Sequence, residues 1–133
     1  MLFRSSIEQG KGNGETILVV DDIQEQLDIA SLMLEQLGYC VSVASSGEAA
    51  VEYMKDNSAD ILVLDMIMYP GIDGLETYRR ILERHPAQKA IITSGFSETS
   101  RVKTAQHLGA GQYIRKPYTI ERLGLAVKQE LER

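Results

Sequence analysis

The chain has 133 residues, a length typical of one domain of ordinary size. Hydrophobic residues make up 44% and charged residues 25%, which allows a core under a solvated surface and excludes a disordered or fibrous protein. The net charge is −5, and basic residues such as Arg79 and Arg80 stand beside the acids Glu76 and Glu83. This pattern argues against a nucleic-acid partner, because such a partner is held by a basic surface.

Cysteine content and apolar run lengths indicate the compartment. The single cysteine, Cys40, excludes an intramolecular disulfide and favours a reducing, cytoplasmic location. Because Cys40 lies in an apolar run, we predict that it is a small core residue rather than a nucleophile. No apolar stretch approaches the roughly 18 residues of a membrane span, and no signal peptide is visible, so no direct membrane contact is expected.

The first 14 residues are polar and rich in glycine towards their end. They are predicted to be a flexible linker, with the folded domain spanning residues 15–133. The glycines do not form a phosphate-binding loop, because that loop follows a strand and enters a helix, whereas here a strand pattern follows.

After residue 14, strand and helix patterns alternate five times along the chain. The predicted strands are 16–20, 39–44, 61–64, 90–93 and 112–115. The predicted helices cover 23–37, 45–57, 73–85, 97–109 and 119–131. Capping residues predict where four of them begin: Ser45 with Glu48, Asp73, Ser97 and Thr119.

Strands separated by helices predict parallel βαβ units with right-handed crossovers. Five units in this length predict an α/β fold: a flavodoxin-like, doubly wound, five-stranded parallel sheet of order 2-1-3-4-5 with five helices. In this order the active crevice lies at the carboxyl ends of the first and third strands. The residues just past 16–20 and 61–64 should therefore carry the chemistry.

Those positions hold Asp21, Asp22 and Asp65. Three carboxylates in one crevice repel one another, and burial adds to the cost, so a divalent cation is expected to offset it. Oxygen-only ligands with open positions suit Mg²⁺. The alternative is that one aspartate, Asp22 or its neighbour, only caps the first helix, which leaves the other two acids unexplained.

Two further strand ends point into the same crevice. The fourth strand ends in Thr93-Ser94-Gly95 and the fifth in Arg115-Lys116-Pro117. An ammonium and a hydroxyl beside a carboxylate–metal cluster make a site for a phosphoryl group, since both can hold its oxygens.

The set Val19-Val20-Asp21-Asp22, Leu64-Asp65, Thr93-Ser94-Gly95 and Lys116-Pro117 resembles the receiver domain of two-component response regulators. The resemblance covers 15–130, nearly the whole chain. Each motif alone is weak, but their order and their placement on these elements make the combination specific.

The resemblance implies that Asp65 is the nucleophile that takes a phosphoryl group from a phosphohistidine and carries it as an acyl phosphate. It implies that Asp22, Asp65 and the backbone carbonyl of Ile67 bind Mg²⁺, while Asp21 holds the ion mainly through water. Lys116 would grip a phosphoryl oxygen. The peptide bond that follows it, to a proline, is often cis in the family.

The resemblance also implies a switch. Ser94 matches the switch hydroxyl because the small Gly95 follows it, and we expect side-chain alternation to turn the less favoured candidate, Thr93, away from the crevice. Tyr113 matches the aromatic switch residue, with a packed strand aromatic as the alternative. Phosphorylation would draw in Ser94, let Tyr113 turn inward and shift the face formed by 97–109, 112–115 and 119–131.

The chain departs from the family pattern near the acceptor. The usual loop reads aspartate, two residues, methionine and proline, whereas here Tyr69 is inserted before Pro70, so the loop should bulge. Ile67 and Phe96 stand where polar residues often tune phosphate lifetime. Because neither can orient an attacking water, a long-lived phosphoryl group is expected.

The implied partners are a histidine kinase or a histidine phosphotransfer domain. The face formed by 97–109, 112–115 and 119–131 is a common dimer surface in the family, so a homodimer is a candidate. The glycine-rich lead and the segment 71–78 resemble a hybrid sensor histidine kinase, in which the receiver relays phosphate onward or restrains its own kinase and could be tethered to a membrane sensor. A free single-domain regulator is the other possibility. His85 and His107 are read as surface or capping residues rather than phosphodonors.

Two other functions fit the fold less well. An Mg²⁺-dependent phosphohydrolase with an aspartyl nucleophile would need a second carboxylate two residues past Asp65, where Ile67 stands. A flavin-binding electron carrier would need a phosphate loop after the first strand, where Asp21 and Asp22 would repel the phosphate.

Overall fold

Five strands and six helices alternate along the chain in the computed structural model, which describes residues 6–133. The strands are β1 (Thr16–Val20), β2 (Cys40–Ala44), β3 (Ile61–Asp65), β4 (Ala90–Ser94) and β5 (Tyr113–Arg115). The helices are α1 (Ser6–Gln9), α2 (Gln24–Gln36), α3 (Gly47–Asp56), α4 (Gly74–Arg84), α5 (Ser100–His107) and α6 (Ile120–Glu132). The predicted strands and helices are all present, and α1 is additional.

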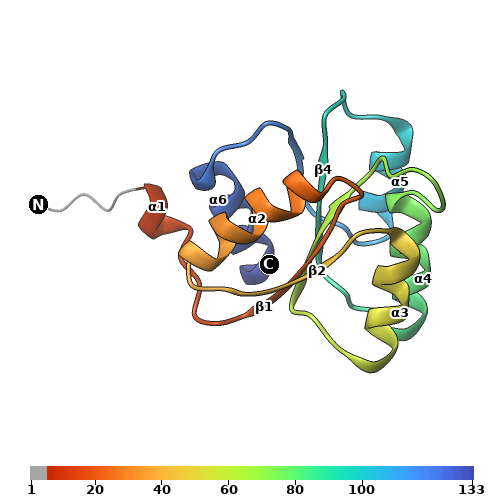
Figure 1. Ribbon diagram of the computed structural model, residues 1–133, viewed down its shortest axis with the longest axis horizontal. Helices are drawn as coiled ribbons and strands as arrows, with labels where there is room; N and C mark the ends of the chain where they lie inside the picture. The colour runs from red at the N-terminus through yellow and green to blue at the C-terminus, as the bar shows by residue number, and fades with distance from the viewer. Residues whose placement is uncertain (1–5) are drawn as a thin grey trace, which may run out of the picture.

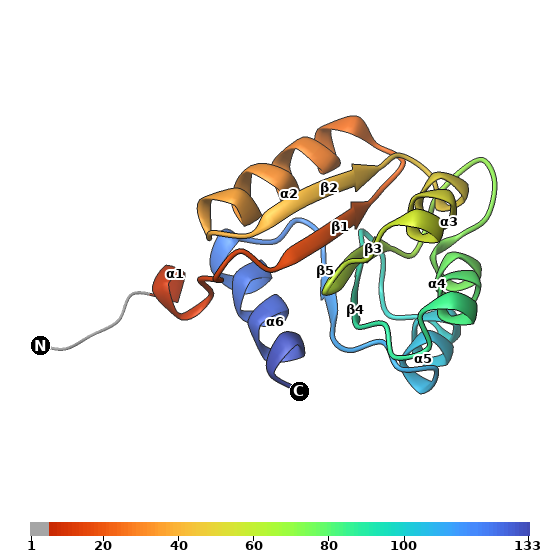
Figure 2. The ribbon, with the colours of Figure 1, turned by 90° about the horizontal axis from the view of Figure 1, so that it is seen from below.

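The strands form one parallel sheet in the predicted order β2-β1-β3-β4-β5. Figures 1 and 2 show α3, α4 and α5 covering one face of this sheet and α2 and α6 covering the other. The interior strand β1 pairs with β2 on one side and with β3 on the other. The chain adds β2 on one side of β1 and the later strands on the other side, so the direction in which strands are added reverses at β1. This confirms the predicted doubly wound fold.

Alternate residues of each central strand enter two separate cores. Leu18 and Val20 of β1 pack with the core under α3, α4 and α5. Ile17 and Val19 pack with the core under α2 and α6. Because both faces of β1 and β3 are buried, the sequence shows continuous aliphatic runs there instead of alternation.

Two predicted helix caps are present. The side chain of Asp73 accepts a hydrogen bond from the backbone N–H of Glu76 at 3.0 Å, and α4 begins at the next residue. Thr119 accepts from the N–H of Arg122 at 3.1 Å and starts α6 in the same way. Each contact satisfies one of the free N–H groups at a helix start.

Two predicted helix starts were wrong by a few residues. Ser46, not Ser45, caps α3, because its hydroxyl accepts from the N–H of Ala49 at 3.0 Å. Thr99, not Ser97, caps α5. In both places several hydroxyl residues stand close together, and the backbone path selects which one reaches the helix.

The prediction for Cys40 was also wrong, because the residue is exposed. It begins β2, which lies at the edge of the sheet. Among residues 6–133 no further strand covers that edge, and Val43 of the same strand is also exposed. An apolar run on an edge strand therefore does not imply burial at each of its positions.

The segment predicted to be a flexible linker contacts the domain at several of its described residues. Its helix α1 contacts α6. The N–H of Gly12 donates to the carbonyl of Leu37 at 2.8 Å, and the buried Tyr39 hydroxyl donates to the carbonyl of Gly10 at 3.1 Å. Residues 1–5 of the predicted linker lie outside the described residues, and the boundary at residue 15 stays a prediction.

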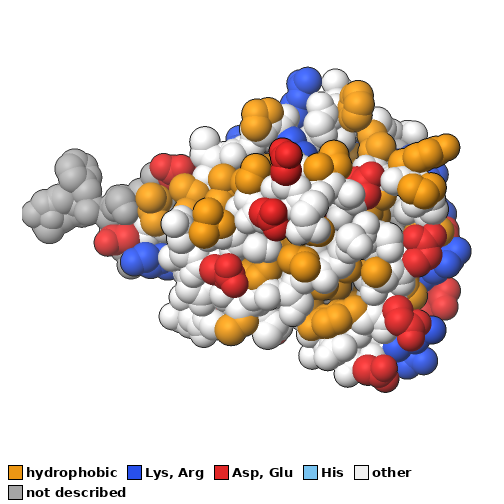
Figure 3. Space-filling model, viewed as in Figure 1, with side chains coloured by type: hydrophobic (Ala, Val, Ile, Leu, Met, Phe, Trp, Pro, Cys, Tyr) orange, Lys and Arg blue, Asp and Glu red, His pale blue; other side chains and the backbone are white. Residues whose placement is uncertain are grey.

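Charged side chains of both signs mix on the surface over α3 and α4, as Figure 3 shows. Glu76 pairs with Arg80 at 3.0 Å and with Arg79 at 3.8 Å, and Lys55 pairs with Glu52 at 3.0 Å. These are exposed pairs along a helix, and each contributes little to stability.

Within residues 6–133, none of the helices combines the length and the apolar character that crossing a membrane requires.

Candidate functional site

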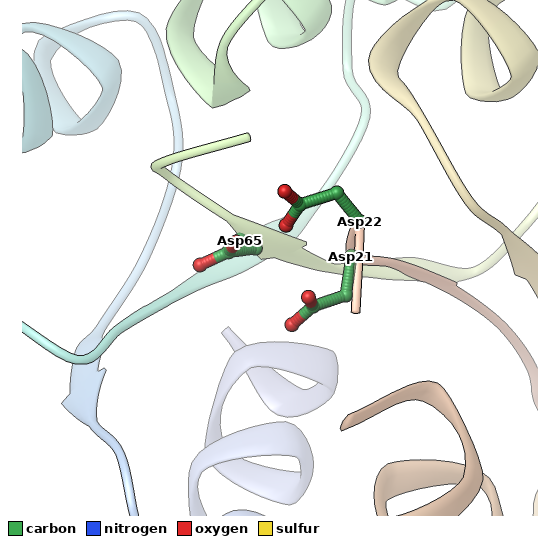
Figure 4. Close-up of side chains that lie close together, drawn as sticks. All are labelled: Asp21, Asp22 and Asp65. Atoms are coloured by element: carbon green, nitrogen blue, oxygen red, sulfur yellow. The ribbon is translucent and has the colours of Figure 1, made fainter. Parts of the chain in front are cut away.

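Three aspartates lie together at the carboxyl ends of neighbouring strands (Figure 4). Asp21 and Asp22 directly follow β1, and Asp65 is the last residue of β3. Carboxylate oxygens of the three residues lie within 4.8 Å of one another. Asp21 and Asp65 are buried and Asp22 is half-buried. The structure thus places the predicted ligand side chains in one crevice.

Lys116 reaches this cluster from the end of β5. Its ammonium contacts the carboxylate of Asp21 directly and lies 3.4 Å from Oδ1 of Asp65. Its backbone N–H donates to the carbonyl of Ser94 at 2.7 Å, which joins the β4 and β5 ends. The peptide bond to Pro117 is cis. One cation therefore faces three carboxylates.

The charge balance shows in the pKa of Asp65, which rises from 3.8 to about 7. Burial is the largest cause, and the neighbouring carboxylates of Asp21 and Asp22 add to it. Lys116 opposes the rise but does not cancel it. In the absence of a further cation, the Asp65 carboxyl is therefore partly protonated at neutral pH.

The two adjacent aspartates hold different backbone groups. Oδ1 of Asp21 accepts from the N–H of Ile23 at 3.0 Å, at the start of α2. Oδ2 of Asp22 accepts from the N–H of Tyr69 at 3.1 Å, in the loop after β3. The N-cap residue of α2 is Ile23, whose side chain makes no cap hydrogen bond, and Asp22 bonds to the loop after β3 rather than to the helix.

The close approach of α4 fixes the loop that follows Asp65. The N–H of Gly74, the first residue of α4, donates to the carbonyl of Met66 at 2.9 Å. A Cβ atom at Gly74 would lie 2.5 Å from the carbonyl oxygen of Asp65, so only glycine fits there. The backbone of Asp65 therefore belongs to β3 and also lies against the start of α4.

A cavity of about 460 Å³ opens beside Asp65. Asp22, Asp65 and Lys116 line its polar part, and Ile67, Tyr69 and Phe96 contribute to its wall. The last three residues are 48%, 83% and 62% exposed, so the cavity has a largely apolar rim. Ile67 thus lines the same crevice as Asp22 and Asp65, and the role of its carbonyl stays a prediction.

The predicted difference between Thr93 and Ser94 was argued from alternation, and that argument is wrong. The ladder between β3 and β4 pairs Asp65 with Thr93. Paired residues of neighbouring strands point to the same face of the sheet, so Thr93 lies on the face of Asp65. Both hydroxyl residues are buried, each 2% exposed. The choice of Ser94 now depends on the family resemblance alone.

Ser94 and Tyr113 meet at the backbone of one residue, Phe96. The Ser94 hydroxyl accepts from the N–H of Phe96 at 3.1 Å, and the Tyr113 hydroxyl donates to the Phe96 carbonyl. This shared contact was not foreseen from the sequence, because it depends on the path of the loop between β4 and α5. The contact of the inserted Tyr69 with Asp22 was likewise not foreseen, although the insertion itself was visible.

A family model for the response regulator receiver domain matches residues 17–128, from β1 into α6. The chain therefore belongs to the response regulator receiver domain family, which acts as a phosphoacceptor in two-component signalling.

Solved structures agree. A response regulator receiver domain protein from Methanospirillum hungatei is 25% identical with a TM-score of 0.83, covering 90% of this chain and 95% of that one. The N-terminal domain of a response regulator/sensory box/GGDEF three-domain protein from Carboxydothermus hydrogenoformans is 27% identical with a TM-score of 0.81, covering 89% and 94%. The BeF3-activated DrrB receiver domain is 32% identical with a TM-score of 0.78, covering 90% and 99%.

Receiver domains in general bind Mg²⁺ at an acidic pocket and interact with histidine kinases or phosphotransfer proteins. In this chain Asp21, Asp22 and Asp65 form an acidic cluster.

Proposed function

We propose that Asp65 accepts a phosphoryl group from the phosphohistidine of a histidine kinase or of a histidine phosphotransfer domain. A carboxylate oxygen of Asp65 attacks phosphorus, an O–P bond forms as the P–N bond breaks, and the imidazole leaves with that electron pair and takes up a proton. The observation that carries the proposal is the buried Asp65 beside two further carboxylates and Lys116, at the mouth of an open cavity.

Mg²⁺ is the cation that this donor set fits. The three carboxylates offer oxygen ligands within 4.8 Å of one another, and a single ammonium opposes them. Asp22, Asp65 and the carbonyl of Ile67 would hold the ion, with Asp21 acting mainly through water. The ion supplies positive charge that offsets the phosphoryl group as it joins three carboxylates.

Lys116 has a second role in this proposal. In the present arrangement its ammonium contacts Asp21 and lies 3.4 Å from Asp65. Its side chain is only 13% exposed, so we expect it to stay in the crevice when Mg²⁺ and the phosphoryl group bind. On phosphorylation it pairs with a phosphoryl oxygen, which is a charge-assisted contact. The lysine thus stabilises the transferred group without forming a covalent bond.

The switch proposal gains support from the backbone of Phe96. Ser94 holds the N–H of that residue and Tyr113 contacts its carbonyl. When the Ser94 hydroxyl turns to the phosphoryl group, the N–H of Phe96 loses its acceptor and the carbonyl contact of Tyr113 loses its fixed partner. The change passes from the acceptor to the face formed by α5, β5 and α6.

The apolar rim supports a long phosphoryl lifetime. Ile67 and Phe96 line the cavity but carry no group that could orient a water for attack on the acyl phosphate. We therefore propose slow self-dephosphorylation. Release of most of the phosphate from the purified, phosphorylated protein within seconds in Mg²⁺ would contradict this.

The wider setting is proposed from the same resemblance. The domain is either a free regulator or the receiver of a hybrid sensor kinase, located in the cytoplasm. The face formed by α5, β5 and α6 is the surface proposed for a homodimer. Comparing the association state of the protein with and without phosphorylation tests that surface, and an unchanged monomer in both states argues against it.

The decisive experiment is incubation with Mg²⁺ and acetyl phosphate, followed by mass measurement of the intact protein. One phosphoryl adduct is expected on the wild type and none on Asp65→Asn. Asp28→Asn is the matched control, because Asp28 is an exposed aspartate on α2 that contacts Gln24. An adduct that persists in Asp65→Asn defeats the assignment of the acceptor.

A further inference from the structure

We infer that the inserted residue, Tyr69, is a positioning residue: its backbone N–H orients the carboxylate of Asp22 for the divalent cation. The inference rests on the proposed function, because it deepens the role of the metal pocket. A loop of the usual family length, without the inserted residue, could not make this ligand-orienting contact.

The contact joins two loops at the crevice. The N–H of Tyr69 donates to Oδ2 of Asp22 at 3.1 Å, so the loop after β3 holds the residue that follows β1. A carboxylate has two oxygens, and fixing one of them fixes the direction of the other. Groups that hold a metal ligand in this way commonly strengthen metal binding.

Loop length decides whether this N–H exists. In the usual family loop, the proline comes directly after the methionine, and proline has no backbone N–H. Here Tyr69 stands between Met68 and Pro70, so an N–H group is present at that position. The insertion therefore adds a donor as well as one residue of length.

The loop is anchored on both sides of Tyr69. The preceding residue, Met68, is buried in the core under α3, α4 and α5. On the other side, the N–H of Ile72 donates to Oε2 of Glu48 on α3 at 3.0 Å. These anchors limit the positions that the Tyr69 N–H can take, as a preorganised ligand-orienting contact requires.

The side chain of Tyr69 does not take part in this contact. It is 83% exposed and lies at the rim of the cavity. The backbone and the side chain can therefore be tested separately, because a change of side chain keeps the N–H and a change to proline removes it.

Three variants separate the two parts. Tyr69→Ala keeps the N–H, Tyr69→Pro removes it at constant length, and deletion of Tyr69 removes it by placing Pro70 after Met68. The Mg²⁺ dissociation constant is measured by calorimetry on the unphosphorylated protein. We expect Tyr69→Ala to stay within about twofold of wild type and the other two to bind roughly tenfold more weakly.

The outcomes separate this inference from the proposed function. If the wild type binds no Mg²⁺, the proposed metal pocket fails. If the wild type binds Mg²⁺ and Tyr69→Pro binds it as tightly as Tyr69→Ala, only the role of the N–H fails. A melting temperature measured without Mg²⁺ shows whether either variant lost affinity through general loss of stability.

A second measurement needs no variant. In amide NMR of the wild type, the Tyr69 N–H is expected to exchange slowly with solvent and to shift on Mg²⁺ saturation. The exposed neighbouring residue Gly71 serves as the reference for a loop amide. A Tyr69 amide that exchanges as fast as this reference and ignores Mg²⁺ overturns the inference even if Tyr69→Pro does not fold.

Discussion

The proton on Asp65 links the acceptor to the stability of the whole domain. Burial raises the pKa of its carboxyl from 3.8 to about 7. Between these values the folded protein keeps a proton that the unfolded chain releases, so without metal the free energy of unfolding falls as pH rises from about 4 to about 7. Asp65→Asn should therefore be more stable than wild type at pH 8, by an amount on the order of a few kcal/mol.

This prediction is checked by urea unfolding in a chelator at pH 5 and at pH 8. The free energy of unfolding of Asp65→Asn should exceed that of wild type by a large amount at pH 8 and by a small amount at pH 5. Mg²⁺ should raise the stability of the wild type at pH 8, because it offsets the charge of the ionised carboxylates. If the unfolding curves of the variant and the wild type are equally far apart at both pH values, the raised pKa of Asp65 is not the cause of the difference.

The two hydroxyls at the end of β4 can be distinguished by substitution. Ser94→Ala should still be phosphorylated by acetyl phosphate, but the NMR signals of Tyr113 should no longer change, because the Ser94 contact with Phe96 is gone. Thr93→Val, the near-isosteric control, should keep the full change. If Thr93→Val loses the response and Ser94→Ala keeps it, the switch hydroxyl is Thr93.

Residues at strand ends were predictable, whereas contacts made by loops were not. Asp21 and Asp65 each follow an aliphatic run and Lys116 follows a short strand pattern, so their place in a parallel sheet follows from the topology. The Tyr69 contact with Asp22 depends on the backbone path of an inserted loop. The face of Thr93 depends on the ladder register between β3 and β4, which the sequence pattern alone leaves open.

At the scale of elements, Asp73 joins two helices. It caps α4 through the N–H of Glu76 and pairs with Arg101 of α5, whose Nε lies 2.5 Å from its carboxylate. Burial alone would raise the pKa of Asp73, but these two contacts outweigh it and lower the pKa. The stability contributed by the ionised side chain is therefore lost as pH falls through this lowered value.

Asp73→Ala should cost about 1–2 kcal/mol, because it removes the cap and the ion pair together. Arg101→Gln removes only the pair, which is half exposed, and should cost less than about 1 kcal/mol. Urea unfolding at neutral pH measures both. Equal losses in the two variants would mean that the cap contributes nothing.

The elements themselves were largely predictable, because β1 and β3 are nearly continuous aliphatic runs and glycine or proline separates many strands from the helices. The helix starts were less so. Ser45 and Ser46 are adjacent, and several hydroxyl residues precede α5, so more than one cap was chemically suitable. Tertiary packing chose among them.

At the scale of the molecule, the glycine-rich lead is part of the fold. A Cβ at Gly10 would lie 2.8 Å from the backbone carbonyl carbon of Gly124 in α6. The two segments of the backbone therefore meet without side chains between them. Lys128 of α6 also donates to the carbonyl of Lys11 at 3.1 Å. A flexible linker was predicted because composition alone does not reveal that a distant glycine leaves room for this contact.

Removal of residues 1–14 should therefore destabilise the domain, by about 1–3 kcal/mol, since hydrogen bonds at the end of α2 lose their partners. Tyr39→Phe, which deletes only the hydroxyl bonded to Gly10, should cost about 1 kcal/mol. Thermal unfolding compares the two with the full chain. A truncated protein as stable as the full chain would show that the packed lead contributes no net stability.

The exposed Cys40 has a practical consequence. It is the single cysteine of the chain and lies on the edge strand β2, where its N–H donates to the carbonyl of Glu15 at 3.0 Å. A thiol-reactive fluorophore or spin label would therefore attach at one defined position of the natural sequence. That position is next to the point where the packed lead joins the sheet, so such a label can report directly whether the lead stays docked when Asp65 is phosphorylated.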